Sequence, residues 1–183
     1  MNNVKELQTI EETLRYLQFD NWEQSAPGLA RSYELLGLLG DPQKKLKFVH
    51  IAGTNGKGST AAMLASVLQS AGYRTGLYTS PHLLRFHERM RVNGKEIDDT
   101  SLISLTNAVR NAAERMSEMP TGFEIMTAIA FLYFVQERCD IVSLEVGLGG
   151  RMDSTNVIPA PEVCVVANIG LEHTAILGDT VEK

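Results

Sequence analysis

The sequence contains few cysteines, and the two that it has do not form a recognisable set. Cys139 and Cys164 stand far apart in a chain of 183 residues. A disulfide framework or a zinc site would need more partners than two isolated cysteines supply. Both cysteines lie in or beside apolar stretches, so we expect two buried thiols that act as small hydrophobic groups.

Long hydrophobic runs are also missing. The longest, near 128–135, falls far short of the roughly 20 apolar residues that cross a bilayer. Residues 1–10 lack the apolar stretch of a signal peptide. The sequence therefore predicts a cytoplasmic protein with no membrane partner.

Positive charge is scarce as well. The formal net charge is -5 and there is no lysine-rich tail, which argues against a nucleic-acid-binding protein, because such proteins neutralise phosphates over a basic surface. Hydrophobic residues make up 44% and charged residues 21% of the chain, as is ordinary for a globular protein. The length predicts a single domain.

Hydrophobic periodicity predicts alternating helices and strands. Expected helices span 4–19, 29–39, 59–71, a segment starting at Asp99 or Thr100, and 123–135. Expected strands span 47–52, 75–79, 141–146 and 163–167, with loops at 21–27 and after Ser80-Pro81 and a hairpin turn at 92–95. The strand at 141–146 is apolar on both faces, like a central strand, and we expect 163–167 to resemble it. The fold class is therefore α/β, with a mostly parallel sheet and flanking helices.

The segment 47–71 carries the strongest chemical signal. A strand leads into Gly53-Thr54-Asn55-Gly56-Lys57-Gly58-Ser59, and a helix follows. Glycines let several backbone N–H groups point at one phosphate, and the helix N-terminus adds a positive dipole. Lys57 would bind the β- and γ-phosphates, and Ser59 or Thr60 would place a hydroxyl near the metal. The order predicts an ATP phosphate-binding loop.

The spacing differs from the common nucleotide-binding loop. Only Thr54 and Asn55 separate Gly53 from Gly56-Lys57, and Gly58 stands between Lys57 and Ser59. The alternative is a glycine-rich turn without a ligand. We favour phosphate binding, because a lysine and a serine add nothing to a turn.

Two further residues follow predicted strands. Glu145 lies near the end of a buried strand, where a carboxylate is costly unless it is paired or bound to a metal. His173 follows a strand end at the same predicted edge, where ligands of open α/β sheets gather. We interpret His50, inside a strand, as structural, and assign no role to His82 and His87 from spacing alone.

Several motifs together resemble the folylpolyglutamate synthase/dihydrofolate synthase family of the Mur ligase superfamily. They are 53–59, 78–82, Phe123-Glu124, 145–156 and 170–174. The resemblance implies an ATP-dependent ligase in which a folate or dihydropteroate carboxylate is phosphorylated and L-glutamate then attacks the acyl phosphate. It also implies Mg²⁺ as a cofactor and a monomeric protein.

The resemblance implies a role for each matching residue. The ATP-binding residues would be Gly53, Thr54, Asn55, Gly56, Lys57, Gly58, Ser59 and Thr60. The pterin-bearing substrate would contact Gly28, Leu29, Ser80, His82, Thr121, Gly122, Phe123, Glu124, Asp153 and Ser154, with Phe123 stacked on the ring. Magnesium would be held by Ser80, Glu145 and His173, so Ser80 replaces Ser59 as the expected hydroxyl ligand. Lys57, Glu145 and His173 would be the catalytic residues.

The sequence departs from the family pattern in three ways. Glu172 replaces the usual aspartate before the histidine. A carboxylated lysine would lie beyond the last residue, and a C-terminal glutamate-ligase domain is absent. Gly178-Asp179-Thr180 also looks like the start of an unfinished helix. We therefore expect residues 1–183 to be an incomplete ATP-binding domain.

Two other functions are compatible with the motifs. One is a small-molecule kinase or another phosphate-loop nucleotidase, although its loop would have the longer spacing. The other is a nucleotide-binding module without catalysis. Only about fifty residues precede Gly53, too few for the additional N-terminal domain of the cell-wall ligases, whose size would be at least ~50–100 residues.

Overall fold

The computed structural model describes residues 6–18 and 28–180. The helices are α1 (Ile10–Leu17), α2 (Ala30–Leu38), α3 (Lys57–Ser70), α4 (Asp99–Ala113), α5 (Gly122–Gln136) and α6 (Thr174–Leu177), with short turns of tighter helix at η2 (Pro42–Lys45), η3 (Phe86–Arg89) and η4 (Ser154–Val157). The strands are β1 (Phe48–Ala52), β2 (Thr75–Tyr78), β3 (Met90–Val92), β4 (Lys95–Glu96), β5 (Ile141–Glu145) and β6 (Val163–Val166). The loop predicted at 21–27, with its tryptophan, lies outside the described residues.

The strands form one mixed sheet in the order β4-β3-β2-β5-β1-β6. The pairs β2–β5, β5–β1 and β1–β6 are parallel, and β3 and β4 add an antiparallel hairpin at the other edge. The hairpin turn uses Asn93 and Gly94, both with positive φ, as the tightest hairpin turns require. The predicted α/β class with a mostly parallel sheet is confirmed.

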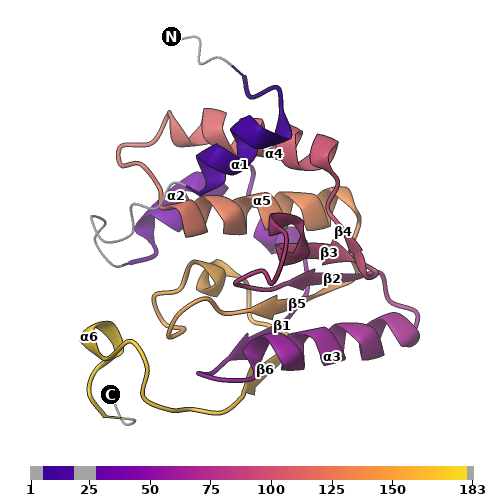
Figure 1. Ribbon diagram of the computed structural model, residues 1–183, viewed down its shortest axis with the longest axis vertical. Coiled ribbons are helices and arrows are strands. Elements are labelled where there is room, and N and C mark those ends of the chain that lie inside the picture. The colour runs from indigo at the N-terminus through magenta and orange to yellow at the C-terminus, as the bar shows by residue number, and fades with distance from the viewer. Residues whose placement is uncertain (1–5, 19–27, 181–183) are drawn as a thin grey trace.

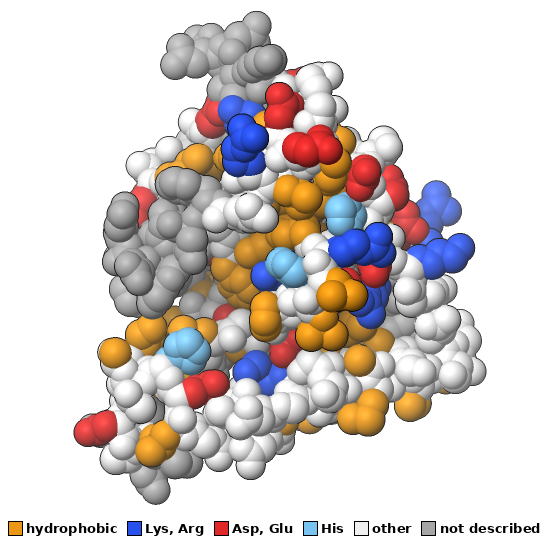
Figure 2. Space-filling view, viewed as in Figure 1, with side chains coloured by type: hydrophobic (Ala, Val, Ile, Leu, Met, Phe, Trp, Pro, Cys, Tyr) orange, Lys and Arg blue, Asp and Glu red, His pale blue; other side chains and the backbone are white. Residues whose placement is uncertain are grey.

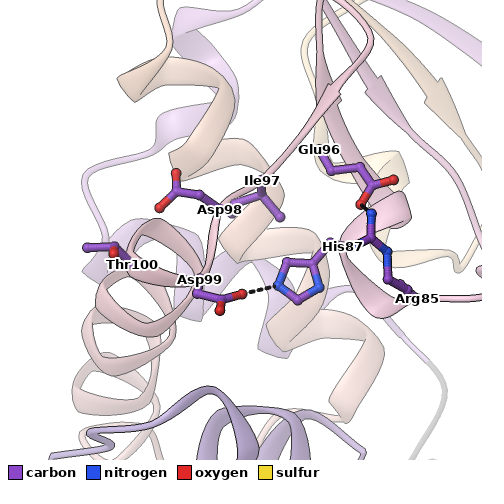
Figure 3. Close-up of a pocket in the computed structure, with 7 residues that line it drawn as sticks. All are labelled: Arg85, His87, Glu96, Ile97, Asp98, Asp99 and Thr100. Carbon is purple, nitrogen blue, oxygen red and sulfur yellow. Dashed lines mark hydrogen bonds and ion pairs between the residues drawn. The ribbon is translucent and has the colours of Figure 1, made fainter.

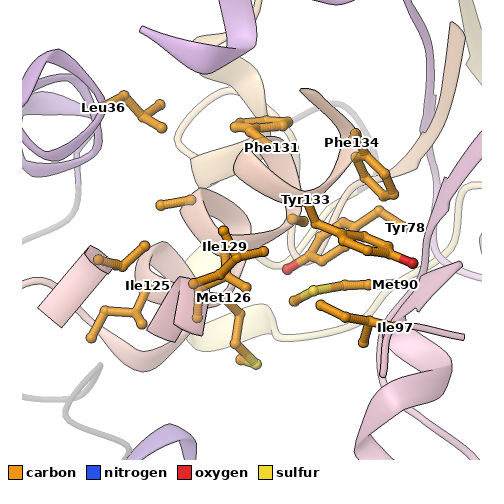
Figure 4. Close-up of a cluster of buried hydrophobic side chains, with 14 of the residues drawn as sticks. Leu36, Tyr78, Met90, Ile97, Ile125, Met126, Ile129, Phe131, Tyr133 and Phe134 are labelled. Carbon is orange, nitrogen blue, oxygen red and sulfur yellow. The ribbon is translucent and has the colours of Figure 1, made fainter. Parts of the chain in front are cut away.

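Helices cover both faces of the sheet (Figure 1). On one face lies α3, and on the other lie α5 and, outside it, α1, α2 and α4. The larger core forms between the sheet and α5, where the ring of Phe131 meets that of Phe48 edge-on at 5.6 Å between centroids. Figure 4 shows the side chains of Tyr78, Met90 and Ile129 within this cluster. Because α5 is covered nearly all round, its prediction as a buried helix is confirmed.

Several predicted boundaries shift. The helix α1 begins at Ile10, because Thr9 caps it, accepting a hydrogen bond from the Glu12 N–H. The cap of α4 is Asp98, which accepts from the Ser101 N–H at 2.9 Å, so the assignment to Asp99 or Thr100 was wrong. Asp179 and Thr180 form a bend, and the helix expected to start after them lies outside the described residues. A short α6 precedes them and ends at Gly178.

The strand β6 was wrongly expected to be buried. It lies at the edge of the sheet and pairs with β1 alone. Val163 and Val166 are 50% and 66% exposed, and Cys164 is exposed, so only Cys139 is the expected buried thiol. Burial raises the pKa of the Cys139 thiol to about 12, which keeps it protonated and unreactive.

Among the described residues, no helix has the length and apolar character required for a membrane span. The outer side of α3 nevertheless exposes Met63 and Val67, and hydrophobic side chains are visible along the lower edge of the face in Figure 2.

Candidate active site

The parallel register of the strands assembles the site. Ile51 of β1 pairs with Glu145 of β5, and Leu144 pairs with Tyr78 of β2. Since parallel strands end at the same edge, the phosphate loop after β1, the Ser80 turn after β2 and the Glu145 carboxylate meet there. These three segments are more than 20 residues apart in the sequence.

The glycine loop connects β1 to α3 as predicted. Gly53 and Gly56 have φ values of 138° and 84°, a region that side chains disfavour. A Cβ on Gly53 would stand 3.0 Å from the Asn168 carbonyl oxygen, so this position also has no room for a side chain. Gly56 caps α3, which begins at Lys57, two residues earlier than predicted.

A second segment supports the loop from behind. The Thr54 N–H donates to the Asn168 carbonyl at 2.7 Å. The Thr54 hydroxyl donates to the Gly170 carbonyl at 3.0 Å and accepts from the Gly170 N–H at 3.1 Å. These contacts fix the position of the loop at the N-terminus of α3. No local sequence pattern indicates this support, because it joins residues 116 positions apart.

Lys57 is folded over the loop that precedes it. Its Nζ donates to the carbonyl oxygens of Gly53 at 2.7 Å and Thr54 at 3.0 Å. The ammonium group therefore lies at the mouth of the loop, where a phosphate would meet it together with the helix N-terminus. Ser59 is exposed and Thr60 is half-buried on the first turn of the same helix.

Glu145 lies beneath this loop and is only 4% exposed. Its Oε2 accepts a hydrogen bond from the Ser80 N–H at 2.9 Å, and a Cβ on Gly58 would come within 3.3 Å of the same atom. Burial raises the pKa of the Glu145 carboxyl, and the Ser80 N–H, the Lys57 charge and the Gly58 N–H partly oppose the shift. A raised pKa of a buried carboxyl at a strand end is typical of a functional carboxylate.

Ser80 and Glu145 fit a magnesium ion, since both offer oxygen atoms and a buried carboxylate gains from a cation. The Ser80 backbone already binds Glu145, so the two residues are adjacent. His173 lies elsewhere, exposed at the N-terminus of α6 with a φ of 46°. Within residues 6–18 and 28–180, the hydrogen bonds of Ser80 and Glu145 do not include His173, and no three His, Cys, Asp or Glu side chains form a metal-binding group. The role of His173 stays a prediction.

The predicted substrate residues around Phe123 form one wall. Thr121 caps α5, and Phe123 lies on its first turn. The Phe123 ring is tilted against that of Tyr78, with 6.2 Å between centroids, and presses on Gly147. The Phe123 side chain is only partly buried, as a residue that stacks on a ligand must be.

Asp153 belongs to the same wall, because it and Phe123 both lie against Gly147. Asp153 Oδ2 accepts from the Leu148 N–H at 2.8 Å, and Oδ1 accepts from the Thr155 hydroxyl at 2.5 Å. The Thr155 oxygen also lies 2.9 Å from His50 Nε2, which must donate because the hydroxyl proton is already engaged. Burial lowers the pKa of His50, and the Asp153 charge partly opposes this. The prediction that His50 is structural is consistent with this chain of contacts.

Other predicted substrate residues have structural partners. Buried Glu124 accepts from Arg31 Nε at 3.1 Å, from the Ser32 hydroxyl at 3.4 Å and from the Thr121 N–H at 2.7 Å. It thereby joins α2 to α5. Gly28, with a φ of 146°, leads into this region. The other predicted contacts nearby are half-buried Leu29, which precedes α2, and Gly122, the first residue of α5.

His82 lies next to the Ser80 turn. Its Nδ1 accepts from Arg89 Nε at 2.9 Å, and its ring stands 6.0 Å from that of Phe86. His87 belongs to a separate hollow of about 530 Å³, lined by Arg85, His87, Glu96, Ile97, Asp98, Asp99 and Thr100. In Figure 3 its imidazole points at Asp99, with 2.8 Å between Nε2 and Oδ1. This hollow shares no lining residue with the predicted site.

Gly147 provides a direct test of the packing of this wall. A Cβ there would stand 2.5 Å from Phe123 Cζ and 2.9 Å from Asp153 Oδ2. We expect Gly147→Ala to lower the free energy of unfolding by ~1–3 kcal/mol, the usual cost of overpacking, as measured by urea denaturation. Gly37→Ala is the control, because a Cβ at exposed Gly37 in α2 meets nothing within 4 Å. Equal stabilities of the two variants would contradict the contact.

No model of a known protein family matches the sequence. The dihydrofolate synthase/folylpolyglutamate synthase of Bacillus subtilis (strain 168) is 48% identical over 162 residues, which are 86% of this chain and 37% of that protein. The structure resembles E. coli FolC in complex with DHPP and ADP, with a TM-score of 0.88 and 39% identity, over 96% of this chain and 42% of that one. It also resembles an FPGS–AMPPCP–folate complex, with a TM-score of 0.90 and 39% identity, over 95% of this chain and 43% of that one.

This chain thus spans about two fifths of the length of the proteins that it matches. Within that span, sequence identity and fold agree along nearly the whole chain. The chain belongs to the folylpolyglutamate synthase/dihydrofolate synthase family.

Proposed function

We propose that the protein of which this chain is part is an ATP-dependent ligase that joins L-glutamate to the carboxylate of a folate or a dihydropteroate. The observation that carries the proposal is the junction of three strand ends, where Lys57, Ser80 and Glu145 meet around the glycine loop. The related structures were solved with DHPP and ADP or with AMPPCP and folate, so a nucleotide and a pterin compound are the ligands to test.

In this proposal the glycine loop and Lys57 bind the ATP phosphates. Ser80 and Glu145 would hold Mg²⁺, which would neutralise charge on those phosphates, with His173 as the predicted third ligand. The substrate carboxylate attacks the γ-phosphorus, forming an acyl phosphate and releasing ADP. The amino group of L-glutamate then attacks the acyl carbon, the amide bond forms, and phosphate leaves with the electrons of the broken C–O bond.

The pterin ring would stack on Phe123, with Asp153 and Ser154 at its edge. The Phe123 side chain is partly exposed, and its packing against Gly147 fixes the orientation of its ring. Predicted contacts at Thr121, Gly122, Glu124 and His82 belong to the same proposal. The ion pair of Glu124 with Arg31 also fixes the position of α5 relative to α2.

The proposal also holds that residues 1–183 form the ATP-binding part of the site and that a C-terminal domain completes it. This chain by itself should then bind Mg·ATP and pteroate but show little ligase turnover. A monomeric state and a cytoplasmic location, with no nucleic-acid or membrane partner, belong to the same proposal.

The test is the dependence of ADP formation on the amine. Mg·ATP and dihydropteroate are supplied with and without L-glutamate, first to this chain and then to a form extended by the missing domain. The extended form should release ADP only with glutamate. ADP release without glutamate would indicate a kinase, and binding without turnover in both forms would indicate a non-catalytic module. Turnover by this chain alone at the rate of the extended form would contradict the incomplete site.

A further inference from the structure

Three buried hydroxyl groups meet at the wall that contains Phe123 and Asp153. The Thr127 Oγ1 on α5 lies 3.3 Å from the Tyr78 hydroxyl on β2 and 2.9 Å from Ser154 Oγ on η4. It also lies 2.9 Å from the carbonyl oxygen of Phe123. Tyr78, Thr127 and Ser154 are 0%, 2% and 6% exposed, so water does not compete for these contacts.

The direction of each hydrogen bond follows from the number of protons. A threonine hydroxyl has one proton and two lone pairs. The Phe123 carbonyl can only accept, so Thr127 donates its proton there. A tyrosine hydroxyl is ordinarily protonated at neutral pH, and the partner of the Tyr78 hydroxyl is Thr127. Tyr78 therefore donates to one lone pair of Thr127, and Ser154 donates to the other.

This arrangement removes the donor capacity of Ser154. Its proton is directed at Thr127, and only the lone pairs of Oγ are left for a ligand. Within the described residues, Ser154 Oγ has no second protein partner. Its neighbour Asp153 also presents acceptors only, and its oxygens already receive the Leu148 N–H and two donors of Thr155.

We propose that Thr127 is a positioning residue that fixes Ser154 as an obligate hydrogen-bond acceptor, so that this wall selects a ring edge with N–H donors over one with a carbonyl group. The inference rests on the proposed pterin site and adds its selectivity. The 2-amino group and ring N–H of a pterin are donors. A lumazine-type ring has a carbonyl oxygen in place of the amino group. That oxygen would face the lone pairs of Ser154 Oγ, and neither atom would have a hydrogen-bond donor, which is costly for buried polar atoms.

The experiment compares binding of pteroate and of its 2-oxo, lumazine-type analogue, with Kd measured by calorimetry. We expect the wild-type protein to prefer pteroate by at least about tenfold, as the loss of a buried hydrogen bond implies. In Thr127→Val the Ser154 proton loses its acceptor and can turn toward the ligand. The ratio of the two Kd values should then fall to within about threefold, which is smaller than the change expected from the loss of one buried hydrogen bond.

The controls separate positioning from stability. Tyr78→Phe removes a different bond to Thr127 and should keep the wild-type preference, as should Thr127→Ser. The double variant Tyr78→Phe/Thr127→Val leaves no unpaired tyrosine hydroxyl, and it replaces Thr127→Val if that variant does not fold. The ligand preference of the double variant is compared with that of Tyr78→Phe, from which it differs only at position 127.

Two results would overturn the inference, and they differ in kind. An unchanged preference in both valine variants, with pteroate still bound, would refute the role of Thr127 and leave the proposed function intact. A folded wild-type protein that binds neither compound would refute the pterin site and the inference together.

Discussion

Replacing Lys57 with alanine is expected to weaken the binding of Mg·ATP by about ten- to a hundredfold, because a hydrogen bond to a charged group contributes ~1.5–3 kcal/mol. The side chain already lies over the loop, bound to the Gly53 and Thr54 carbonyls. A phosphate would therefore meet a positive charge close to its final position. Calorimetric titration of both proteins with Mg·ATP measures the change.

The same substitution should hardly change stability. The two carbonyl groups that Lys57 releases are in the half-buried loop, where water can replace the ammonium group. A melting curve checks this. Lys95→Ala, at an exposed position of the β3–β4 hairpin, removes the same charge far along the chain from the loop and should bind like the wild type. Equal affinities of Lys57→Ala and wild type would rule out phosphate binding by this lysine.

The second large effect is expected at Glu145. Glu145→Gln keeps the size and one oxygen of the side chain but removes its charge. The factor by which Mg²⁺ strengthens ATP binding should fall by at least about tenfold. Loss of a residue that only hydrogen-bonds to a metal ligand already lowers metal affinity by about that factor. Titrations with ATP in the presence and absence of Mg²⁺ give this ratio. Glu162→Gln, at an exposed position before β6, is the control, and an unchanged Mg²⁺ response in Glu145→Gln would exclude Glu145 as a ligand.

The pH dependence of stability provides an independent readout for Glu145. Its pKa is raised in the folded protein, so the folded state binds the proton more tightly than the unfolded state does. The contribution of Glu145 to stability is thus fully present below the unfolded pKa of about 4.3 and is lost as the pH rises through the raised folded pKa. The free energy of unfolding of wild type, relative to Glu145→Gln, should decrease over that window and then level off. A difference that increases with pH would contradict the raised pKa.

Together these two predictions imply that Glu145 reduces stability in favour of function. In the ligand-free protein, the cost of burying the ionised form of Glu145 is only partly offset by the Ser80 N–H, the Lys57 charge and the Gly58 N–H. A bound cation would remove this cost. Such a conflict between local stability and local chemistry is typical of functional sites.

Local elements were the most predictable part of the fold. The strand and helix on either side of the glycine loop depend on periodicity over a few residues and on glycines that permit positive φ. The position of the α4 cap was missed by one residue because Asp98 and Asp99 are adjacent and both suit a helix start. The side chain that bonds to the Ser101 N–H decides between them.

Burial was less predictable than periodicity. Residues 163–166 are as apolar as those of β5, yet Cys164 is exposed. The pattern of a strand indicates which residues can be buried, but the number of its neighbours decides whether they are. The strand order places β5 between β1 and β2 and leaves β6 with one partner.

The sequence by itself determined the α/β class, the phosphate loop with Lys57, and the carboxylate at Glu145, because each depends on residue types within one short segment. Only the tertiary structure placed Ser80 against Glu145, fixed the proton of Ser154 through Thr127, and left His173 exposed on α6. Ser80 and Glu145 are 65 positions apart in the sequence, and Thr127 and Ser154 are 27 positions apart. Those relations depend on strand order and on the geometry of single hydrogen bonds, which local patterns do not encode.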